Sequence, residues 1–225
     1  MTYASGGLIE ATDYNTLVGG NPVTSSGKLN TVWATGGSDK GYGQTALANV
    51  SVGQTVAASE WANLVNKTSN SASHQGSSIT AVTAPVTGDT VTYNSNIPSN
   101  LTTIYTNRLN AASQGSTASN TATYGSTWSA ALTFTHTATF ANGDAARYFF
   151  NSGGQLAITC SHPNGSGIDL LLNNLASNVG TVVISSPSSG SITVSSTSYN
   201  GVTKIGGGGN APTISTNSGY YGLTT

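Results

Sequence analysis

Charged side chains are scarce in this sequence. Of its 225 residues, six are Lys or Arg and seven are Asp or Glu, whereas an ordinary soluble domain carries about 25% charged residues. Acid–base pairs, metal centres and phosphate-binding loops all require titratable or cationic side chains to come together. Here these residues, and the three histidines, are scattered singly along the chain. We therefore expect a protein that is not an enzyme and that holds no metal or cofactor.

Cysteine and long apolar runs are lacking as well. Cys160 is the single cysteine, so an intrachain disulfide is impossible and a small secreted domain held by disulfides is excluded. The first residues contain no basic stretch followed by an apolar run, so no signal peptide is expected. No segment approaches the roughly 20 apolar residues of a membrane span. With a net charge of -1 and no cluster of Lys or Arg, nucleic-acid binding through phosphate contacts is not expected either.

The residues that are present favour a folded protein with an uncharged polar surface. Hydrophobic residues make up 36% of the chain and include ten Tyr, four Phe and three Trp, which is enough to form a core. Ser, Thr, Asn and Gly supply most of the remainder. A surface hydrated by hydroxyls and amides depends little on salt or pH. This composition suggests a durable protein that works outside a cell.

Two segments in the first third of the chain, residues 9–18 and 56–65, resemble one another. In each, apolar residues recur at i, i+3 and i+4, which predicts a helix with one apolar stripe. The alternative is a pair of unrelated helices that use common capping residues. The two stripes consist of Tyr14, Leu17 and Val18, and of Trp61, Leu64 and Val65.

The starts of these two helices are predicted from their polar residues. Thr12 and Ser59 are expected to be N-caps, accepting hydrogen bonds from the free amides of the first turn. Asp13 and Glu60 follow directly, where the positive end of the helix dipole favours acidic side chains. The two segments are therefore expected to make equivalent packing contacts.

Two more helices are predicted before residue 113. A short stripe at Leu29, Val32 and Trp33 indicates a brief helix between the two similar segments. A longer helix is expected over residues 97–112, where Pro98 suits a first turn. Between them, residues 36–43 form a glycine-rich connector, and residues 111–120 contain nothing to bury, which places a domain boundary there.

Beyond residue 120 the apolar period changes from 3.6 to 2. From Trp128 to Phe140, apolar residues at even positions alternate with Ser and Thr, which predicts a strand with one buried face. A hairpin turn is expected at Asn142 to Asp144, followed by strands over 145–150 and 155–161. A helix over 168–179, ended by Gly180, interrupts the strands, which resume at 181–185, 191–195 and 202–205.

These elements predict an α+β protein in three parts. Residues 1–78 form a helical segment with the internal repeat, which would dock on a larger assembly. Residues 79–120 form a linker and the third helix. Residues 121–225 form a mainly antiparallel, β-sandwich-like domain, because short strands at regular spacing with turn residues between them are typical of sandwiches.

Several motifs, spread over most of the chain, together carry a family resemblance. They are Asp13-Tyr14-Asn15, Val32-Trp33, Gly41-Tyr42-Gly43-Gln44, His74-Gln75, Arg147-Tyr148-Phe149-Phe150-Asn151 and Gly219-Tyr220-Tyr221-Gly222-Leu223. With these motifs the sequence resembles a group of virion structural proteins of tailed bacteriophages, marine and cyanobacterial phages in particular. The resemblance implies a fibre, neck or tail appendage protein and carries no functional site across. Members of the group are expected to continue through a further strand where this sequence stops, at Thr225.

The cysteine and histidines have plain structural interpretations. Cys160 and His162 lie two residues apart and His136 is the nearest other histidine, but a metal site needs at least three convergent ligands. We expect Cys160 to be a small apolar core residue on a strand. His74 ends the second repeat helix, where it favours the negative end of the dipole; a ring of histidines binding an ion on a threefold axis is the alternative.

The acidic residues do not form an evident catalytic pair. A glycan-degrading tailspike needs paired carboxylates, and Asp89, Asp144 and Asp169 lie in segments with no evident reason to converge. Arg147 is the charged residue with the most specific surroundings. We expect it to pair with Asp144 across the hairpin turn or to stack on an aromatic ring.

The leading hypothesis is a non-enzymatic virion component that is made in the host cytoplasm and acts through assembly. Its expected partners are itself, as a homotrimer, and other virion proteins, because the amino-terminal helices bury too little surface to be stable alone. The alternative is a receptor-binding adhesin in which Tyr220, Tyr221, Asn210 and Asn217 on loops recognise host surface glycan. The residues expected to mediate packing or assembly are Tyr14, Leu17, Trp33, Trp61, Leu64, Tyr105, Arg147 and Phe149.

Overall fold

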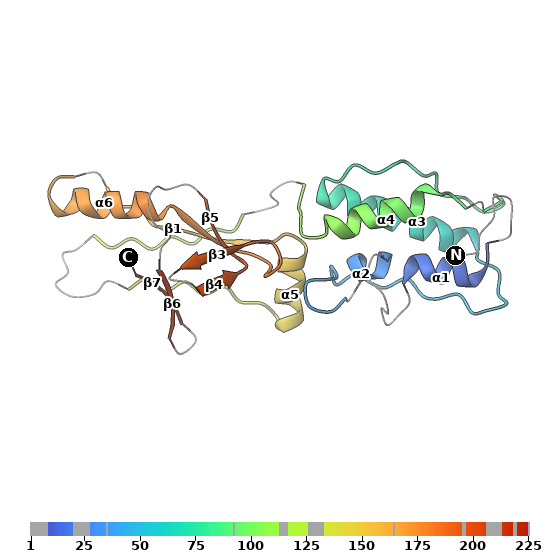
Figure 1. The fold of residues 1–225 in the computed structure, drawn as a ribbon, viewed down its shortest axis with the longest axis horizontal. Coiled ribbons are helices and arrows are strands. Elements are labelled where there is room, and N and C mark those ends of the chain that lie inside the picture. Colours follow the sequence, from blue (N-terminus) through green and yellow to red (C-terminus); the bar gives the residue numbers. More distant parts are fainter. Residues whose placement is uncertain are drawn as a thin grey trace.

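The structure is a computed structural model of the chain. It describes residues 9–19, 28–34, 36–91, 93–112, 117–125, 133–163, 165–194, 197–205, 213–217 and 220–224. Helix and strand are mixed, as the sequence predicts, and they are arranged in two lobes that lie end to end (Figure 1). The amino-terminal lobe is helical, and the carboxy-terminal lobe contains the strands together with two further helices.

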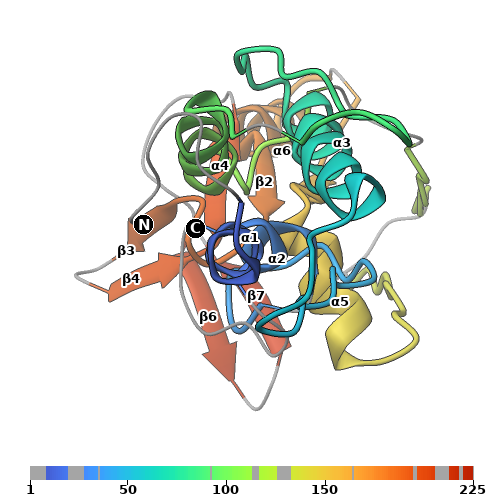
Figure 2. The same ribbon diagram turned by 90° about the vertical axis from the view of Figure 1, so that its right-hand side faces the viewer.

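The amino-terminal lobe is built from four helices around one apolar core. They are α1 (Ala11–Val18), α2 (Leu29–Trp33), α3 (Ala58–Gln75) and α4 (Asn96–Thr106). Seen along the long axis, α3 and α4 lie next to one another, above α1 and α2 (Figure 2). The core consists of Ala11, Tyr14, Leu17, Val18, Leu29, Val32, Leu47, Val50, Val56, Trp61, Leu64, Val65, Ala72, Ile97, Leu101 and Ile104.

Both similar segments contribute to this core, through matching aromatic residues. Tyr14 of α1 and Trp61 of α3 are each only 2% exposed, and their ring centroids lie 6.4 Å apart. The helical segment thus encloses its own core within one chain. Within one chain the apolar stripes of the four helices cover one another.

The two helices begin alike, but two residues earlier than predicted. Glu10 and Ala57 are the N-cap residues, so the predictions of Thr12 and Ser59 as caps are wrong. Asp13 and Glu60 occupy the third helical position. There they accept hydrogen bonds from the backbone N–H groups of the two cap residues, at 3.3 and 2.7 Å. Each acid thereby satisfies a backbone donor at its helix start, which is half of a capping box.

Helix α4 is shorter than predicted, ending at Thr106 rather than at residue 112. The reason lies in the turn that follows. The carbonyl of Arg108 accepts a hydrogen bond from the Tyr42 hydroxyl at 2.7 Å, and the Arg108 side chain binds Asp39. In that turn the N–H of Asn110 donates to the carbonyl of Asn107 at 2.9 Å, three residues back instead of the four of an α-helix.

Long extended segments run beside the helices and are held there by asparagine side chains. Asn30 of α2 is fully buried; its Oδ1 accepts from the N–H of Leu47 at 3.0 Å and its Nδ2 donates to the carbonyl of Leu47 at 2.9 Å. Asn15 of α1 holds Val50 in the same way, at 2.9 and 2.8 Å. A primary amide carries one acceptor and two donors, so it can occupy both polar groups of one backbone residue.

A third asparagine repeats the arrangement on another helix. Asn100 of α4 accepts from the N–H of Thr80 at 3.1 Å and donates to its carbonyl at 2.8 Å. We call the pairs Asn15 with Val50, Asn30 with Leu47 and Asn100 with Thr80 the asparagine clamps. They supply the backbone of the extended segments with the pairing that a neighbouring strand would give in a sheet.

Replacement of Asn30 by Leu should test how much a clamp contributes to the free energy of unfolding. The change keeps the side-chain volume but leaves the N–H and the carbonyl of Leu47 without these partners, at about 1–3 kcal/mol each. We expect the free energy of unfolding to fall by about 2–6 kcal/mol in urea denaturation. The control is Asn66→Leu on the exposed side of α3, which should change stability by less than about 0.5 kcal/mol. Equal effects of the two changes would contradict the role of the clamp.

The carboxy-terminal lobe contains two helices and seven short strands among the described residues. The helices are α5 (Gly143–Asn151) and α6 (Ile168–Val179). Strands β1 (Leu156–Thr159), β2 (Thr181–Ile184) and β5 (Val202–Ile205) form an antiparallel sheet with β2 in the centre, where Val182 and Val183 are buried. Two antiparallel pairs complete the lobe: β3 (Ser191–Val194) with β4 (Thr197–Asn200), and β6 (Thr213–Asn217) with β7 (Tyr220–Thr224).

The prediction of this lobe is confirmed in part. Helix α6 has the predicted bounds and ends at Gly180, which has a positive φ of 66°. Strands β1, β2, β3 and β5 lie within the segments predicted as strands. A β-sandwich, however, is not seen among the described residues, whose strands form one three-stranded sheet and two separate pairs.

The prediction of a hairpin around residue 143 is wrong. The expected return strand, residues 145–150, is helix α5, and residues 133–140 are neither helix nor strand; Trp128, Ala130 and Leu132 lie outside the described residues. Asn142 explains the difference, because it is an N-cap whose Oδ1 accepts from the N–H of Ala145 at 2.8 Å. With helix α5 in place of the return strand, the described residues 133–140 have no adjacent return strand to pair with.

Three further predicted positions can be placed. Cys160 follows β1 and is exposed, so its prediction as a core residue is wrong. Asn217 and Tyr220 lie on strands β6 and β7 rather than on loops, and Asn210 lies outside the described residues. No helix in the described part of the chain is both long enough and apolar enough to cross a membrane.

Candidate functional site at the junction of the lobes

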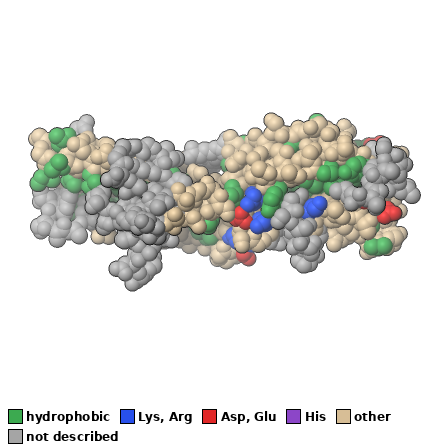
Figure 3. All heavy atoms as spheres, in the orientation of Figure 1, with side chains coloured by type: hydrophobic (Ala, Val, Ile, Leu, Met, Phe, Trp, Pro, Cys, Tyr) green, Lys and Arg blue, Asp and Glu red, His purple; other side chains and the backbone are tan. Residues whose placement is uncertain are grey.

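Charged residues gather where the two lobes meet. In the space-filling view a group of blue and red side chains lies at the junction, on a surface that is mostly tan and green (Figure 3). Asp39 and Lys40 come from the glycine-rich connector between α2 and α3, and Arg108 follows α4. Asp144 and Arg147 come from α5 of the other lobe. These residues and the loop 36–43, which we call the junction loop, form the best-defined polar site of the molecule.

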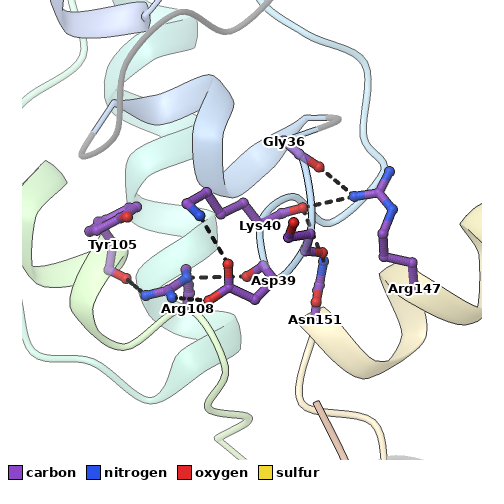
Figure 4. Close-up of polar contacts among 8 residues, drawn as sticks. Gly36, Asp39, Lys40, Tyr105, Arg108, Arg147 and Asn151 are labelled. Carbon is purple, nitrogen blue, oxygen red and sulfur yellow. Dashed lines mark hydrogen bonds and ion pairs between the residues drawn. The ribbon is translucent and has the colours of Figure 1, made fainter. Parts of the chain in front are cut away.

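Asp39 is held by cations from two sides (Figure 4). Its carboxylate accepts from Nζ of Lys40 at 2.9 Å and from Nη2 of Arg108, while Nε of Arg108 donates to the Asp39 carbonyl at 3.2 Å. Arg108 is fixed in turn by Tyr105, whose carbonyl accepts from Nη1 at 3.0 Å and whose ring lies 4.8 Å from the guanidinium carbon. Arg108 thus ties the end of α4 to the junction loop.

These contacts determine the protonation of Asp39. Burial alone raises the pKa of its carboxyl, but hydrogen bonds from Lys40, Arg108 and Ser188, with the positive charge of Arg108, outweigh burial and hold the pKa well below its usual range. Ser188 belongs to the turn between β2 and β3, so the carboxyl group is contacted from the carboxy-terminal lobe as well.

Helix α5 binds the other side of the junction loop through its backbone carbonyls. Nη1 of Arg147 donates to the carbonyl of Gly36 and, at 3.1 Å, to that of Lys40. Nδ2 of Asn151, which is buried, donates to the carbonyls of Ser38 and Lys40, at 3.0 Å each. One turn of α5 therefore supplies two donor side chains to a loop that lies more than 100 residues earlier in the sequence.

Both contacts predicted for Arg147 are present. Its Nη2 lies 3.1 Å from Oδ1 of Asp144, and its guanidinium carbon lies 4.4 Å from the centre of the Tyr148 ring. The ion pair joins neighbouring turns of one helix rather than the two arms of a hairpin. Because Asp144 is largely exposed, this pair adds little to stability, and the carbonyl contacts to the junction loop are the more important ones.

Two glycines allow the junction loop to approach its neighbours closely. Gly41 has a φ of 88°, and a Cβ atom there would lie 2.4 Å from the carbonyl oxygen of Ala34. Gly43 has a φ of 71°, and a Cβ atom there would lie 2.4 Å from the ring of Tyr148 on α5. Side chains at either position would strain the backbone, and one at Gly43 would also clash with α5 of the other lobe.

Tyr42, between the two glycines, connects the junction loop to α3. Its hydroxyl accepts from Nε2 of Gln75 at 2.7 Å while donating to the carbonyl of Arg108. Burial raises the pKa of Tyr42 to about 12, although the hydrogen bond from Gln75 and the charge of Arg108 act in the opposite direction. His74 packs edge-on against the Tyr42 ring at 5.2 Å, and its Nε2 lies 2.8 Å from the carbonyl of Ser152, which adds another tie between the lobes.

The residues predicted to mediate packing or assembly occupy three places. Tyr14, Leu17, Trp61 and Leu64 lie in the helical core. Trp33 is half-buried beside it, with Lys67 4.6 Å above its ring. The other three lie at or beside the junction. The ring of Tyr105 packs against Arg108, and Arg147 of α5 donates to the junction loop. The ring centroid of Phe149 lies 5.3 Å from that of Phe140 and 5.2 Å from that of Phe150.

Sequence reasoning missed Asp39, Arg108 and Asn151 as residues of the junction. One signal was available for Asp39, since a charged pair inside a glycine-rich loop is unusual in a chain with so few charges. Arg108 was assigned to a helix that in fact ends before it. Asn151 could not be distinguished from the chain's many other asparagines.

The three carboxylates weighed for glycan hydrolysis have separate local contacts. Asp89 accepts from the N–H of Val86 at 2.8 Å, Asp144 pairs with Arg147, and Asp169 lies 3.8 Å from Nε2 of His162. Within the described ranges, no group of three or more His, Cys, Asp or Glu side chains is placed to hold a metal ion. The junction residues are paired with one another and with backbone carbonyls, and this arrangement fixes one lobe against the other.

Comparison of the chain with protein-family models, with curated proteins and with solved structures found no match.

Replacement of Arg147 by Ala should loosen the junction. Charge-assisted hydrogen bonds contribute about 1.5–3 kcal/mol each, so the loss of both carbonyl contacts should destabilise the protein by about 3–6 kcal/mol. Amide hydrogen exchange should accelerate in the junction loop. The control, Asp144→Asn, removes only the exposed ion pair and should cost less than about 1 kcal/mol. If both variants exchange like the parent, the junction is not held by Arg147.

The free energy of unfolding should be nearly constant over a broad range of pH and should fall on both the acidic and the alkaline side. The pKa of Asp39 is lowered by folding, so its contribution is present above the unfolded value of about 3.9 and is lost as the pH falls below it. Burial, with a smaller effect of Glu60, raises the pKa of Tyr14 to about 12, as burial does for Tyr42. Both phenols remain neutral in the folded state while the unfolded chain ionises near pH 10, so stability should fall from about pH 10 to pH 12.

Urea denaturation across pH can separate these groups. Between about pH 5 and pH 9 the curve should be nearly flat, because few groups titrate there. The variant Asp39→Asn should be less stable at pH 7 and should lose less stability on acidification than the parent. An acid limb of unchanged steepness in this variant would contradict the assignment to Asp39.

Proposed function

We propose that the chain is a non-enzymatic structural component of a tailed-phage virion, a fibre, neck or tail appendage, that acts through assembly. The proposal rests on the resemblance of its motifs to such proteins and on the use made of its charged side chains. We also propose that the carboxy-terminal domain is β-sandwich-like.

The observation that carries the proposal furthest is the junction. Arg147 and Asn151 of α5 donate to carbonyls of the junction loop and so fix the two lobes end to end. Within the amino-terminal lobe, Arg108 holds Asp39 of that loop in place. A carboxylate whose pKa lies well below its usual range, between two cations, is a poor general acid or base at neutral pH. A rigid, elongated body is what an architectural element of a particle requires.

The polar surface fits the same role. Residues 117–125 and much of the outward side of α3 are exposed and consist mainly of Ser, Thr, Asn and Ala. Such a surface remains hydrated over a wide range of salt and pH, which suits a protein outside a cell.

Immunogold labelling of purified particles of the encoding phage tests this proposal. We expect gold at one structure of the particle, with the same antibody detecting the chain by blotting. A chain that is present in infected-cell lysate but absent from purified particles would contradict the proposal. Binding of the isolated chain to intact host cells, together with label at the distal tip, would favour the adhesin instead.

A further inference from the structure

An asparagine followed directly by a glycine is a reactive pair, and this chain contains three of them. The backbone nitrogen of the glycine can attack the side-chain amide carbon of the asparagine, because a residue without Cβ leaves the backbone free to bring the two atoms together. Asn164 lies outside the described residues, so two of the pairs can be compared in the structure. The three pairs are Asn142-Gly143, Asn164-Gly165 and Asn200-Gly201.

The backbone nitrogen of Gly201 is held away from this reaction. Gly201 is buried in the turn between β4 and β5, and its N–H donates to the carbonyl of Gly190 at 2.7 Å. Its own carbonyl accepts from the N–H of Ser185, also at 2.7 Å. Attack by this nitrogen would require the turn to leave both contacts. The fold therefore protects Asn200.

The backbone nitrogen of Gly143 is in the opposite situation. Gly143 is exposed and is the first residue of α5, a position whose N–H has no partner within the helix. In the part of the chain that the structure describes, this N–H donates to no other group either. A Cβ atom at Gly143 would meet nothing within 4 Å, so the backbone has room to turn. Asn142 is exposed as well, so water reaches the reacting atoms.

The start of α5 also favours the charge that this attack creates. As the nitrogen adds to the amide carbon, negative charge develops on Oδ1 of Asn142. That oxygen already accepts from the N–H of Ala145 at 2.8 Å, and a hydrogen bond to an oxyanion is stronger than one to a neutral amide oxygen. The positive end of the helix dipole acts in the same direction. The N-cap contact is thus placed where the oxyanion forms.

We infer that Asn142 is a site of spontaneous deamidation, with the backbone nitrogen of Gly143 as the nucleophile. This nitrogen loses its proton to solvent base and bonds to the amide carbon, and the side-chain nitrogen takes up a proton and leaves as ammonia. Water then opens the cyclic imide. Opening at the side-chain carbonyl gives aspartate, and opening at the backbone carbonyl gives isoaspartate. The reaction requires only water and does not depend on the virion role.

The two products should act differently on the junction of the lobes. Aspartate keeps an acceptor oxygen at the N-cap and adds a negative charge at the positive end of the helix. Isoaspartate lengthens the backbone by a methylene group, which displaces the acceptor from the first turn. Loss of a cap shifts the folding equilibrium of a helix by about 2- to 30-fold. Because α5 presents Arg147 and Asn151 to the junction loop, isoaspartate should loosen the contact between the lobes.

Incubation of the purified chain in warm neutral buffer, followed by peptide mapping, tests the site. Conversion at each pair is read from the mass difference between an amide and an acid, and the two products are separated by chromatography. We expect Asn142 to convert at least about 10-fold faster than Asn200, whose neighbouring nitrogen becomes free only when its turn opens. In concentrated urea the two should convert at similar rates, because the fold no longer distinguishes them.

The variant Gly143→Ala provides a matched control. Its backbone lies in a helix without a positive φ and has open space around it, so a Cβ is accommodated and the variant should fold like the wild type. Conversion of Asn142 should slow by at least about 10-fold, while that of Asn200 stays unchanged. In the aged wild type, amide hydrogen exchange of the junction loop should accelerate in the isoaspartate fraction and not in the aspartate fraction.

Three results would overturn the inference. The first is equal conversion of Asn142 and Asn200 in the folded wild type. The second is a preference for Asn142 that persists in urea, which would assign the site to the local sequence and not to the fold. The third is unchanged conversion of Asn142 in Gly143→Ala. Hydrogen exchange that is equal in the two product fractions would overturn the predicted effect on the junction.

Discussion

The amide side chain of asparagine is the group on which the amino-terminal lobe depends. Asn15, Asn30 and Asn100 each bind both the N–H and the carbonyl of one residue in an extended segment. The lobe has no described β-strand, so these segments would otherwise offer unpaired backbone to the core. Because an amide is neutral, it can be buried beside apolar residues at a much lower desolvation cost than a charged group. The low charge of the sequence is thus compatible with a well-ordered polar interior.

Arginine side chains take a different role at the junction of the lobes. Arg147 presents several fixed donors to carbonyls of the junction loop across the junction, and Arg108 holds the same loop against the end of α4. Gly41 and Gly43 bring this loop close enough to be reached. The junction therefore combines the cation of Arg147 with the neutral amide of Asn151, whereas the interior of the amino-terminal lobe uses neutral amides.

Sequence reasoning recovered elements whose signals are local. The stripes of α1 and α3 and the bounds of α6 follow from apolar spacing, and the buried positions of Tyr14 and Trp61 follow with them. It failed where a neutral side chain has two possible roles. Asn142 before Gly143 resembles a hairpin turn yet caps a helix, and this single choice changed residues 145–150 from strand to helix. The junction could not be predicted, because its contacts join Arg147 to residues more than 100 positions away, and the clamps could not be told from the chain's other asparagines.

We expect asparagine side chains to hold the extended segments as firmly as a sheet would. Native-state hydrogen exchange measures this directly at the amides of Leu47, Val50 and Thr80. These three amides should exchange with the slow rates of the helical core, far more slowly than the amides of the exposed turn glycines Gly53 and Gly88. Exchange of the three clamped amides at the rates of those two glycines would contradict it.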